Sequence, residues 1–346
     1  MLKRIEIKNF RGIRAGLIDS LTRLVVILGP NGAAKSTVLE ACAVGASRIP
    51  ATELGTVVQR RSQTWNGARW IVFGGAVGTE AVLDCTWDGG ARLVRRLHYE
   101  PLYAEGLVER LEKRALPRPY SVLMVKRDTP AVPENQNLSA TACSADNQYE
   151  SLNAQPELDL KVDPVTYVEP RWGVPLHDLF SKAVQAGQRD ALVQGVRTVM
   201  PALQGLEILT EEGTPRLFLR FDKLAVPATL AGDGISSMLR IAFELAAPAH
   251  GTVLLEEPEV HQHPRSLMWC ARAILASTRR GVQVILTTHS LELLDRLLSE
   301  LSDTELSDPT LMSVLRTSLV DGQLNAVSIP AVGAESARSS LEEDLR

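Results

Sequence analysis

The stretch GPNGAAKST, residues 29–37, decides the fold of this chain. It matches the phosphate-binding pattern G-x-x-x-x-G-K-[ST] at Gly29, Lys35 and Ser36. An apolar run with branched side chains, residues 24–28, comes before it, and a helix-like stretch, residues 36–47, follows it. A phosphate loop requires strand, turn and helix in this order. The sequence therefore predicts an α/β fold with a nucleotide site.

A phosphate loop binds anions mainly through its backbone. Successive N–H groups and the N-terminus of the following helix attract phosphate oxygens without help from particular side chains. We expect Lys35 to reach the β- and γ-phosphates of ATP, and Ser36 to coordinate Mg²⁺. The residues expected to contact the nucleotide are Asn31, Gly32, Ala33, Ala34, Lys35, Ser36 and Thr37.

Ala34 is the one departure from this pattern, which has a glycine directly before the lysine. Glycine adopts a positive φ freely, whereas the left-handed conformation costs alanine about 1–2 kcal/mol. The methyl group of Ala34 also projects toward the place where the backbone should approach phosphate. We therefore expect a weakened or reshaped site that still binds nucleotide.

A second motif, TVLLEEPEVHQHP (residues 252–264), ends an apolar run on paired carboxylates. Glu256 and Glu257 fall at the C-terminal end of a predicted strand, where parallel-sheet proteins place their ligand chemistry. Glu256 is expected to hold Mg²⁺ or its water, and Glu257 to orient or deprotonate the attacking water. The alternative is a solvated acidic loop. His261 and His263 follow, but two histidines without a third ligand are a weak metal signal.

A third segment, GVQVILTTHSLELLDRL (residues 281–297), has the pattern of a strand followed by an amphipathic helix. His289 lies at the turn between them, where it could hydrogen-bond the γ-phosphate or the attacking water. The alternative is a turn histidine, with Ser290 capping the helix.

Together these segments resemble the ABC-type ATPases, and more narrowly the soluble RecF/SMC/OLD-like branch with its small prokaryotic members. The opening LKRIEIKNFRGI is similar to that branch's first strand and turn, LLEEPEVHQHP to its Walker B and D-loop, and TTHS to its switch-histidine segment. LAGDGISSMLRIAFELA (residues 230–246) is similar to its signature segment, and ESARSSLEEDLR to the C-terminal end of small members. The resemblance covers residues 1–45 and 225–346.

In that family, two heads enclose two ATP molecules, and the signature segment of one head contacts the γ-phosphate bound to the other. The resemblance therefore implies a homodimer joined by ATP, in which Gly234 and Ser236 face the partner's nucleotide at a helix N-terminus. Gly232 falls where a serine is usual, so a hydroxyl donor is missing. Together with Ala34, this departure implies slow turnover or a nucleotide-gated switch. The alternative is a glycine-rich loop that caps a core helix.

The helix that follows Gly234 is expected to bury apolar side chains in the head, and its first turn to be free of acidic side chains. Its expected core residues are Met238, Leu239, Ile241 and Leu245.

The middle of the chain is the variable part. Runs within residues 70–99 (WIVFGG, AVLDCTW, ARLVRRLHY) alternate like antiparallel strands, which would extend the N-terminal sheet. Residues 129–148 are polar and contain prolines, so we expect an exposed loop or insertion. Residues 177–203 are expected to be helical, with buried positions at Leu179, Val184, Leu192, Val196 and Val199.

These patterns divide the chain into three parts. Residues 1–125 form an N-terminal lobe with the phosphate loop and a β extension. Residues 126–225 form an insertion and a helical lid region, and residues 226–346 a C-terminal lobe with the signature, Walker B and switch histidine.

Composition limits the function classes. The chain has 346 residues, of which 45% are hydrophobic and 23% charged, as in an ordinary globular protein. Because no signal peptide or bilayer-long apolar run is apparent, we expect a cytoplasmic protein without a membrane partner. The scattered cysteines predict reduced, buried thiols rather than a disulfide or metal framework. These are Cys42, Cys85, Cys143 and Cys270.

The net charge of −4 attracts no nucleic acid by itself, so DNA binding would need a local patch. A basic cluster could face DNA phosphates. Because glutamates are interleaved with it, a solvated surface is the alternative. The cluster comprises Arg92, Arg95, Arg96, Arg110, Lys113, Arg114, Arg118, Lys126 and Arg127.

The sequence thus predicts an α/β ABC-ATPase head with an N-terminal antiparallel β extension and a helical insertion. We expect it to bind ATP and Mg²⁺, hydrolyse ATP slowly, dimerise head-to-head on ATP and control a separate effector protein. The resemblance implies a role in DNA repair or phage defence. The alternative is a nucleotide-gated sensor or scaffold with little or no hydrolysis, and a transporter subunit is a weaker third.

Overall fold

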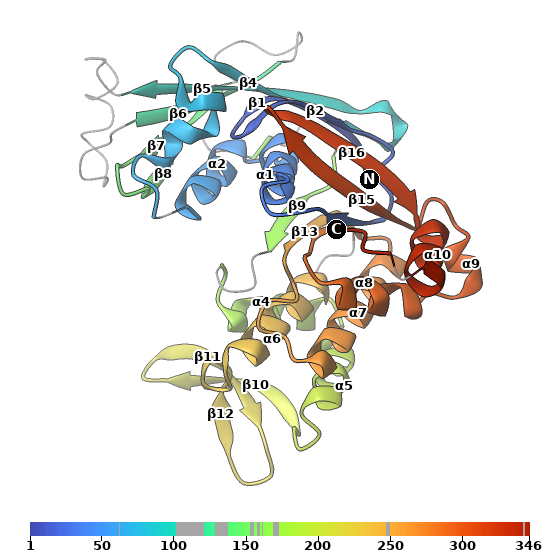
Figure 1. Cartoon of the computed structure of the whole chain (residues 1–346). Helices are drawn as coiled ribbons and strands as arrows, with labels where there is room; N and C mark the ends of the chain where they lie inside the picture. The colour runs from blue at the N-terminus through green and yellow to red at the C-terminus, as the bar shows by residue number, and fades with distance from the viewer. Residues whose placement is uncertain are drawn as a thin grey trace. The chain divides into compact units, whose positions relative to one another are not determined.

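Two compact units make up the fold, and each is assembled from separate parts of the sequence (Figure 1). The first unit comprises Met1–Leu21, Pro30–Val165 and Thr317–Val327, and the second Thr22–Gly29, Thr166–Arg316 and Ser328–Arg346. The structure is a computed structural model. It describes residues 1–61, 63–101, 121–128, 138–152, 156–157, 160, 162–168, 173–246, 250–341 and 343–346.

The first unit is built on an antiparallel sheet. Its strands are β1 (Leu2–Phe10), β2 (Ile13–Ile18), β4 (Glu80–Trp87), β5 (Arg92–Pro101), β6 (Ser121–Arg127), β7 (Leu138–Cys143) and β8 (Tyr149–Leu152). β1 pairs with β2 on one side and with β4 on the other, and β5 to β8 follow in chain order. Ile5 and Ile7 are fully buried, as their alternation predicts, and Leu2 is also buried where the pairing with β4 shifts register between Leu2 and Arg4. The predicted β extension of the N-terminal sheet is therefore confirmed.

Two local predictions in this unit are wrong. The run WIVFGG is not a strand, because Gly74 and Gly75 take positive φ angles of 68° and 63° and turn the chain. It forms the 3-10 turns η1 (Gly67–Ile71) and η2 (Phe73–Gly75). Within the predicted loop 129–148, β7 pairs with β6 and its last residues are buried, because strand pairing shields a segment with little apolar character. Residues 129–137 lie outside the described residues.

Two helices, α1 (Lys35–Ala46) and α2 (Pro50–Gln59), lie on one face of this sheet (Figure 1). A further 3-10 turn, η3 (Asp88–Gly90), joins β4 to β5. All four cysteines of the chain are buried and unpaired, as predicted. Burial raises the pKa of the Cys42 thiol to about 12, so this thiol is protonated and unreactive at neutral pH.

The second unit contains a parallel sheet. Its strands are β3 (Leu24–Leu28), β9 (Val165–Val168), β13 (Thr252–Glu256), β14 (Gln283–Thr287) and the start of β15 (Met312–Val320). β14 pairs in parallel with β13 on one side and with β3 on the other, and β15 pairs with β3. Every residue of β3 and β14 is buried, as strands covered on both faces require. β16 (Gln323–Pro330) is divided between the units, and its first two residues pair with β2 in the first.

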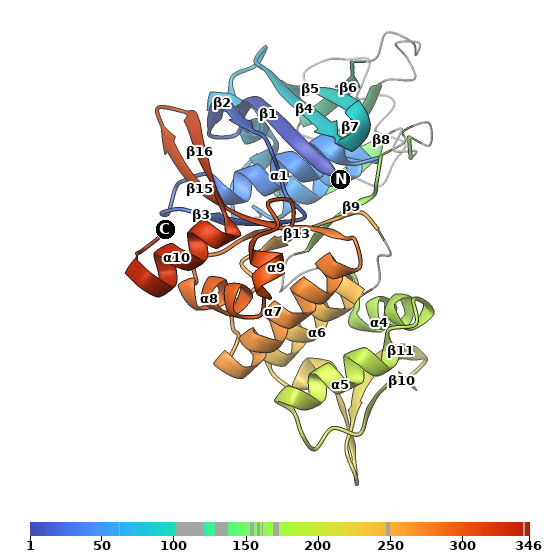
Figure 2. The same ribbon diagram turned by 90° about the vertical axis from the view of Figure 1, so that its right-hand side faces the viewer.

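In the second unit, α7 lies between α6 and α8 (Figure 2), and α4 and α5 pack against α6 and α7. The helices are α4 (Leu176–Gln185), α5 (Arg189–Val199), α6 (Asp233–Ala246), α7 (Pro264–Arg279), α8 (Leu291–Ser299), α9 (Asp303–Leu306) and α10 (Ala331–Leu341). A small antiparallel sheet of β10 (Gly205–Glu211), β11 (Thr214–Arg220) and β12 (Ala225–Pro227) leads through η5 (Ala228–Leu230) to α6.

The predicted helix over residues 177–203 is two helices, broken where Gly187 has a φ of 74°. Leu179, Leu192 and Val196 are buried as expected, whereas Val199 is half-buried. The prediction that Val184 is buried is wrong, because this residue is near the end of α4 and its side chain is 37% exposed.

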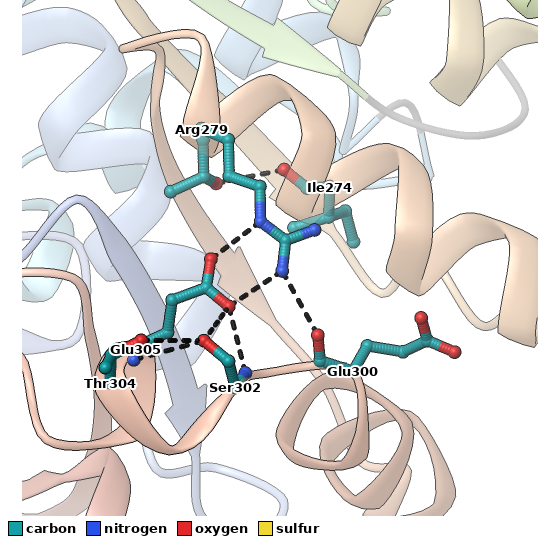
Figure 3. Close-up of polar contacts among 7 residues, drawn as sticks. Ile274, Arg279, Glu300, Ser302, Thr304 and Glu305 are labelled. Atoms are coloured by element: carbon teal, nitrogen blue, oxygen red, sulfur yellow. Dashed lines mark hydrogen bonds and ion pairs between the residues drawn. The ribbon is translucent and has the colours of Figure 1, made fainter.

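The short helix α9 is held by an ion pair and a capping box (Figure 3). Arg279, at the end of α7, donates from Nε and Nη2 to the two carboxylate oxygens of Glu305, at 2.7 and 2.9 Å. The N–H of Ser302 donates to Glu305 Oε2 at 2.9 Å.

In the part of the chain that the structure describes, no helix is both long and apolar enough to cross a bilayer.

Candidate nucleotide-binding site

The loop after β3 has the backbone conformation of a phosphate loop. Positive φ angles occur at Gly29 (152°), Gly32 (81°) and Ala34 (63°). Ala34 has a ψ of 20°, which places it in the left-handed region, and it forms the N-cap of α1. The strain expected at Ala34 is therefore present in the backbone of the loop.

The start of α1 fits an anion. No described side chain caps this helix, and its first turn carries no acidic residue, so its first N–H groups keep their positive end. Gly32 leaves open space, because a Cβ built there would meet no atom within 4 Å. The Lys35 ammonium is buried over the loop and donates to the carbonyl of Pro30 at 3.1 Å.

The other predicted loop residues differ in exposure. Asn31 and Gly32 are exposed, Ala33 is buried, and Ser36 and Thr37 are half-buried at the first turn of α1. The uncapped start of α1 and the open space at Gly32 therefore fit the phosphates of a nucleotide, held mainly by backbone donors.

The acidic motif lies at the carboxyl ends of the parallel strands. In the register of the second unit, Ile27 of β3 is level with Thr287 of β14, which is level with Glu256 of β13. Glu256 thus lies at the carboxyl-end edge of the parallel sheet. β3 ends at this same edge, and the phosphate loop follows β3 in the chain. Its Oε2 accepts a hydrogen bond from the Tyr167 hydroxyl, on β9, at 2.7 Å. Sequence reasoning missed Tyr167, because nothing in the sequence signals that β9 lies beside β13.

Glu257 and His289 come together across two adjacent strands. His289 Nε2 lies 3.5 Å from Glu257 Oε1, and both side chains are partly exposed. The N–H of Glu257 donates to the Thr287 carbonyl at 3.0 Å, which holds the residue just beyond the strand end. Its φ of 43° is uncommon for a residue other than glycine, and such conformations gather at functional sites. The two predicted catalytic side chains are thus neighbours, and both are partly exposed to solvent.

A third carboxylate, Glu259, joins this group and was not assigned from the sequence. Its Oε1 accepts a hydrogen bond from the N–H of His289 at 2.8 Å, which ties the segment after β13 to the one after β14. Burial raises the pKa of Glu259, and hydrogen bonds from Thr288 and the His289 N–H counteract this. The sequence signal that could have indicated Glu259 is its place as the last residue of EEPE, two residues after Glu257. Ser290 caps α8 by accepting from the Leu293 N–H at 3.1 Å, which is the cap that the alternative interpretation of this turn expected.

The signature helix differs from expectation at its start. α6 begins at Asp233, one residue earlier than predicted, so its first turn does contain an acid and that expectation was wrong. Ser236 Oγ donates to the Ala228 carbonyl at 3.2 Å. Gly234 lies against the carbonyl of His261, which is 2.7 Å from the position of a Cβ. The predicted core residues Met238, Leu239, Ile241 and Leu245 are all buried.

His263 has a structural role. Its side chain is the N-cap of α7 and accepts from the Arg265 N–H at 3.3 Å. His261 is exposed and has a φ of 64°. The two histidines therefore belong to the turn between β13 and α7.

The described arginines of the basic cluster are engaged in ion pairs. Arg95 is fully buried and donates to Glu157 and to the Ser47 carbonyl, so it cannot face DNA. That prediction was wrong because β5 turns this side chain into the unit. Arg92 pairs with Asp84, Arg96 with Glu80 and Asp128, and Arg127 with Glu157. Arg110, Lys113, Arg114 and Arg118 lie outside the described residues.

Comparisons with known proteins bear on the family and the fold of the chain. The family model “AAA domain, putative AbiEii toxin, Type IV TA system” matches residues 171–295. Two relatives from Methanocaldococcus jannaschii, the uncharacterised proteins MJECL11 and MJECL10, are 40% identical over 72 residues and 39% identical over 67 residues. These matches cover 20% and 19% of this chain, which spans 63% and 31% of the length of the two relatives.

Among solved structures, the fold is similar to an SMC head bound to the C-winged helix domain of ScpA. The TM-score is 0.51 at 12% identity, over 96% of this chain and 99% of that one. The fold is thus that of an α/β ABC-type ATPase head of the P-loop class. The matched family and this fold confirm the resemblance to ATPases of the RecF/SMC/ABC-like branch.

Proposed function

We propose that this chain binds ATP and Mg²⁺, hydrolyses ATP slowly, and dimerises head-to-head on ATP to control a separate effector. The observation that carries the proposal is the pair Glu257–His289, 3.5 Å apart at the carboxyl ends of adjacent parallel strands. In a fold of this class, that edge of the sheet is where phosphoryl chemistry takes place.

Each predicted residue has a role in this proposal. Asn31 to Thr37 would hold the phosphates through backbone donors, with Lys35 on the β- and γ-phosphates. Ser36 and Glu256 would hold Mg²⁺, and the Tyr167 hydroxyl bond would restrain the Glu256 carboxylate. The bound metal ion would neutralise charge that develops on the transferred phosphate.

Glu257 would accept a proton from the attacking water, and His289 would orient that water or the γ-phosphate. Both side chains are partly exposed, so a water molecule can reach the carboxylate. Glu257 is held beyond the end of β13 by its backbone bond to Thr287, which fixes the carboxylate for this task.

The proposed dimer rests on the family resemblance and on the start of α6. Gly234 and Ser236 would face the nucleotide of the partner. Asp233 in the first turn opposes an anion there, and the strained Ala34 lies in the other phosphate-contacting segment. These features support slow turnover. They also favour the second candidate, a nucleotide-gated sensor or scaffold with little hydrolysis.

The biological context is part of the proposal. The description of the matched family names a toxin of a type IV toxin–antitoxin system, which is compatible with phage defence. The similar SMC head is bound to a partner protein, which is compatible with a separate effector. We propose DNA repair or phage defence as the setting, with nucleic acid as an optional partner.

Glu257→Gln tests the catalytic assignment. This change removes the base but keeps the shape of the side chain, so hydrolysis should fall at least a hundredfold while ATP stays bound and traps a dimer. Glu256→Gln is the matched control, because it should instead weaken Mg²⁺-dependent binding. Hydrolysis with and without DNA, and light scattering with ATP and Mg²⁺, measure these effects. A Glu257→Gln protein that hydrolyses ATP at the parental rate contradicts the assignment.

Mixing two variants tests the composite site. Lys35→Ala disables the loop, and Ser236→Asp places a negative charge where the partner's phosphate would lie. Each protein alone should fail to associate with ATP. In the mixed dimer one site carries both changes and the other carries neither, so the mixture should recover part of the association. Normal association of Ser236→Asp alone would show that the signature helix does not contact nucleotide.

A further inference from the structure

The second unit contains a cavity of about 650 Å³, and Ser236 is the one residue that its lining shares with the nucleotide contacts proposed above. It is formed by the start of α4, strand β11, the turn η5, the first turns of α6 and His261. Its volume falls within the range of about 300–1,000 Å³ that is usual for small-molecule sites. No residue of the phosphate loop contributes to it.

Basic side chains outnumber acidic ones in the lining. Arg216, Arg240, His177 and His261 line the cavity, and Asp233 is the acidic residue among those that form it. Because two of the basic groups are guanidinium groups with several donors, the cavity favours an anion that can accept several hydrogen bonds.

The two arginines are available for such a ligand. Arg240 Nη1 donates to the Val174 carbonyl at 2.7 Å, so this cation is oriented by a neutral group. Burial lowers the pKa of Arg240, as expected for a cation removed from water, although Glu244 counteracts this. Arg216 Nε lies 3.3 Å from Glu211 Oε2, and both side chains are more than half exposed. An ion pair of this kind contributes little stability, so a ligand can replace it.

The other lining residues add apolar surface and hydroxyl groups to the cavity. Leu176, Leu217 and Ala228 form an apolar wall, while Thr229 and Ser236 bring hydroxyl groups. A cationic end and an apolar wall suit a molecule with a phosphate at one end and a flat ring at the other.

We infer that this cavity binds a phosphate-bearing small molecule of nucleotide size, at a site distinct from the phosphate loop. Arg216 and Arg240 hold the phosphate, and the apolar wall holds the ring. Ser236 belongs both to this lining and to the helix turn proposed to face the partner's nucleotide. A ligand in the cavity would therefore affect dimer formation through Ser236. The inference that the cavity binds a ligand does not require the dimer.

Titration of AMP into the full-length Lys35→Ala protein tests the inference, with isothermal calorimetry as the readout. Loss of Lys35 weakens the loop, so AMP bound at one molecule per chain reports the cavity. Adding Arg216→Gln should weaken this binding about tenfold, as loss of a charged hydrogen bond does. Adding Thr229→Trp should abolish it, because Thr229 is exposed and a large side chain there fills the cavity.

Arg220→Gln is the matched control. Arg220 lies on the same strand as Arg216, is similarly exposed and pairs with Glu207 of β10 at 2.8 Å, but it lies outside the cavity. It should leave the affinity for AMP unchanged. Equal effects of Arg216→Gln and Arg220→Gln, or no AMP binding by the Lys35→Ala protein, would overturn the inference. Adenosine that binds as tightly as AMP would overturn the phosphate contact, and pyrophosphate that binds as tightly as AMP would overturn the ring contact. These titrations do not measure ATP hydrolysis. A negative result here can therefore be distinguished from a failure of the proposed ATPase function.

Discussion

Glu259 Oε1 accepts a hydrogen bond from the backbone N–H of His289 at 2.8 Å. The bond joins segments that are thirty residues apart in the chain, and it fixes the turn that presents the His289 ring to Glu257. Glu259 is therefore a positioning residue in the proposed site, since it acts through His289 rather than on the substrate.

Replacing Glu259 tests this relationship. Glu259→Ala removes the acceptor and leaves a part-buried N–H unpaired, so kcat for ATP hydrolysis should fall about tenfold. Glu259→Gln keeps an acceptor oxygen and should restore most of the rate. ATP affinity, measured by titration, should be unchanged in both. Equal loss of rate in the two variants would show that the charge of Glu259, rather than its hydrogen bond, matters.

Ala34→Gly should stabilise the folded protein. Ala34 has the left-handed conformation, so glycine relieves its cost of about 1–2 kcal/mol in the folded state. Glycine adds entropy to the unfolded chain, which leaves a net gain of about 0.5–1 kcal/mol in the free energy of unfolding. Urea denaturation measures this gain. A loss of stability would show that the loop does not hold Ala34 in this conformation.

Gly234→Ala should destabilise the second unit through a steric clash. A Cβ at this position would lie 2.7 Å from the backbone carbonyl oxygen of His261, which cannot move without displacing its turn. The expected loss in the free energy of unfolding is about 1–3 kcal/mol. Gly205→Ala is the matched control, because the nearest atom to its Cβ is a flexible Arg220 side chain at 3.8 Å. Similar unfolding midpoints for the two variants would contradict this packing.

The free energy of unfolding should decrease at acidic pH, because Glu305 loses its charge and its ion pair with Arg279. Its hydrogen bond with Arg279 and the N–H of Ser302 lower its pKa from the ordinary 4.5 to about 2 (Figure 3). Because the folded-state pKa is depressed, this contribution is complete above pH 4.5 and is lost as the pH falls toward 2. It should amount to no more than about 1 kcal/mol, since solvent screens the pair. Urea denaturation at pH 5 and pH 3 should show a smaller decrease for Glu305→Gln than for the parent. An identical decrease would contradict the role of this pair.

Local patterns in the sequence determined the elements that carry the site. The apolar runs of β3, β13 and β14, the turn at Ser290 and the buried face of α6 depend on neighbours a few residues away. Periodicity and capping rules describe such neighbours directly. The motif spacing also placed Lys35 at the start of α1, and Glu257 and His289 just beyond the ends of β13 and β14.

Tertiary structure alone decided the relationships between distant segments. The bonds from Tyr167 to Glu256 and from His289 to Glu259 depend on strand register and on which strand lies beside which. The burial of Arg95 depends on the path of β5 and on Glu157, 62 residues away. A hydrophobic pattern encodes which face of an element is buried, but not which element covers that face. These contacts therefore emerge only when the chain is folded.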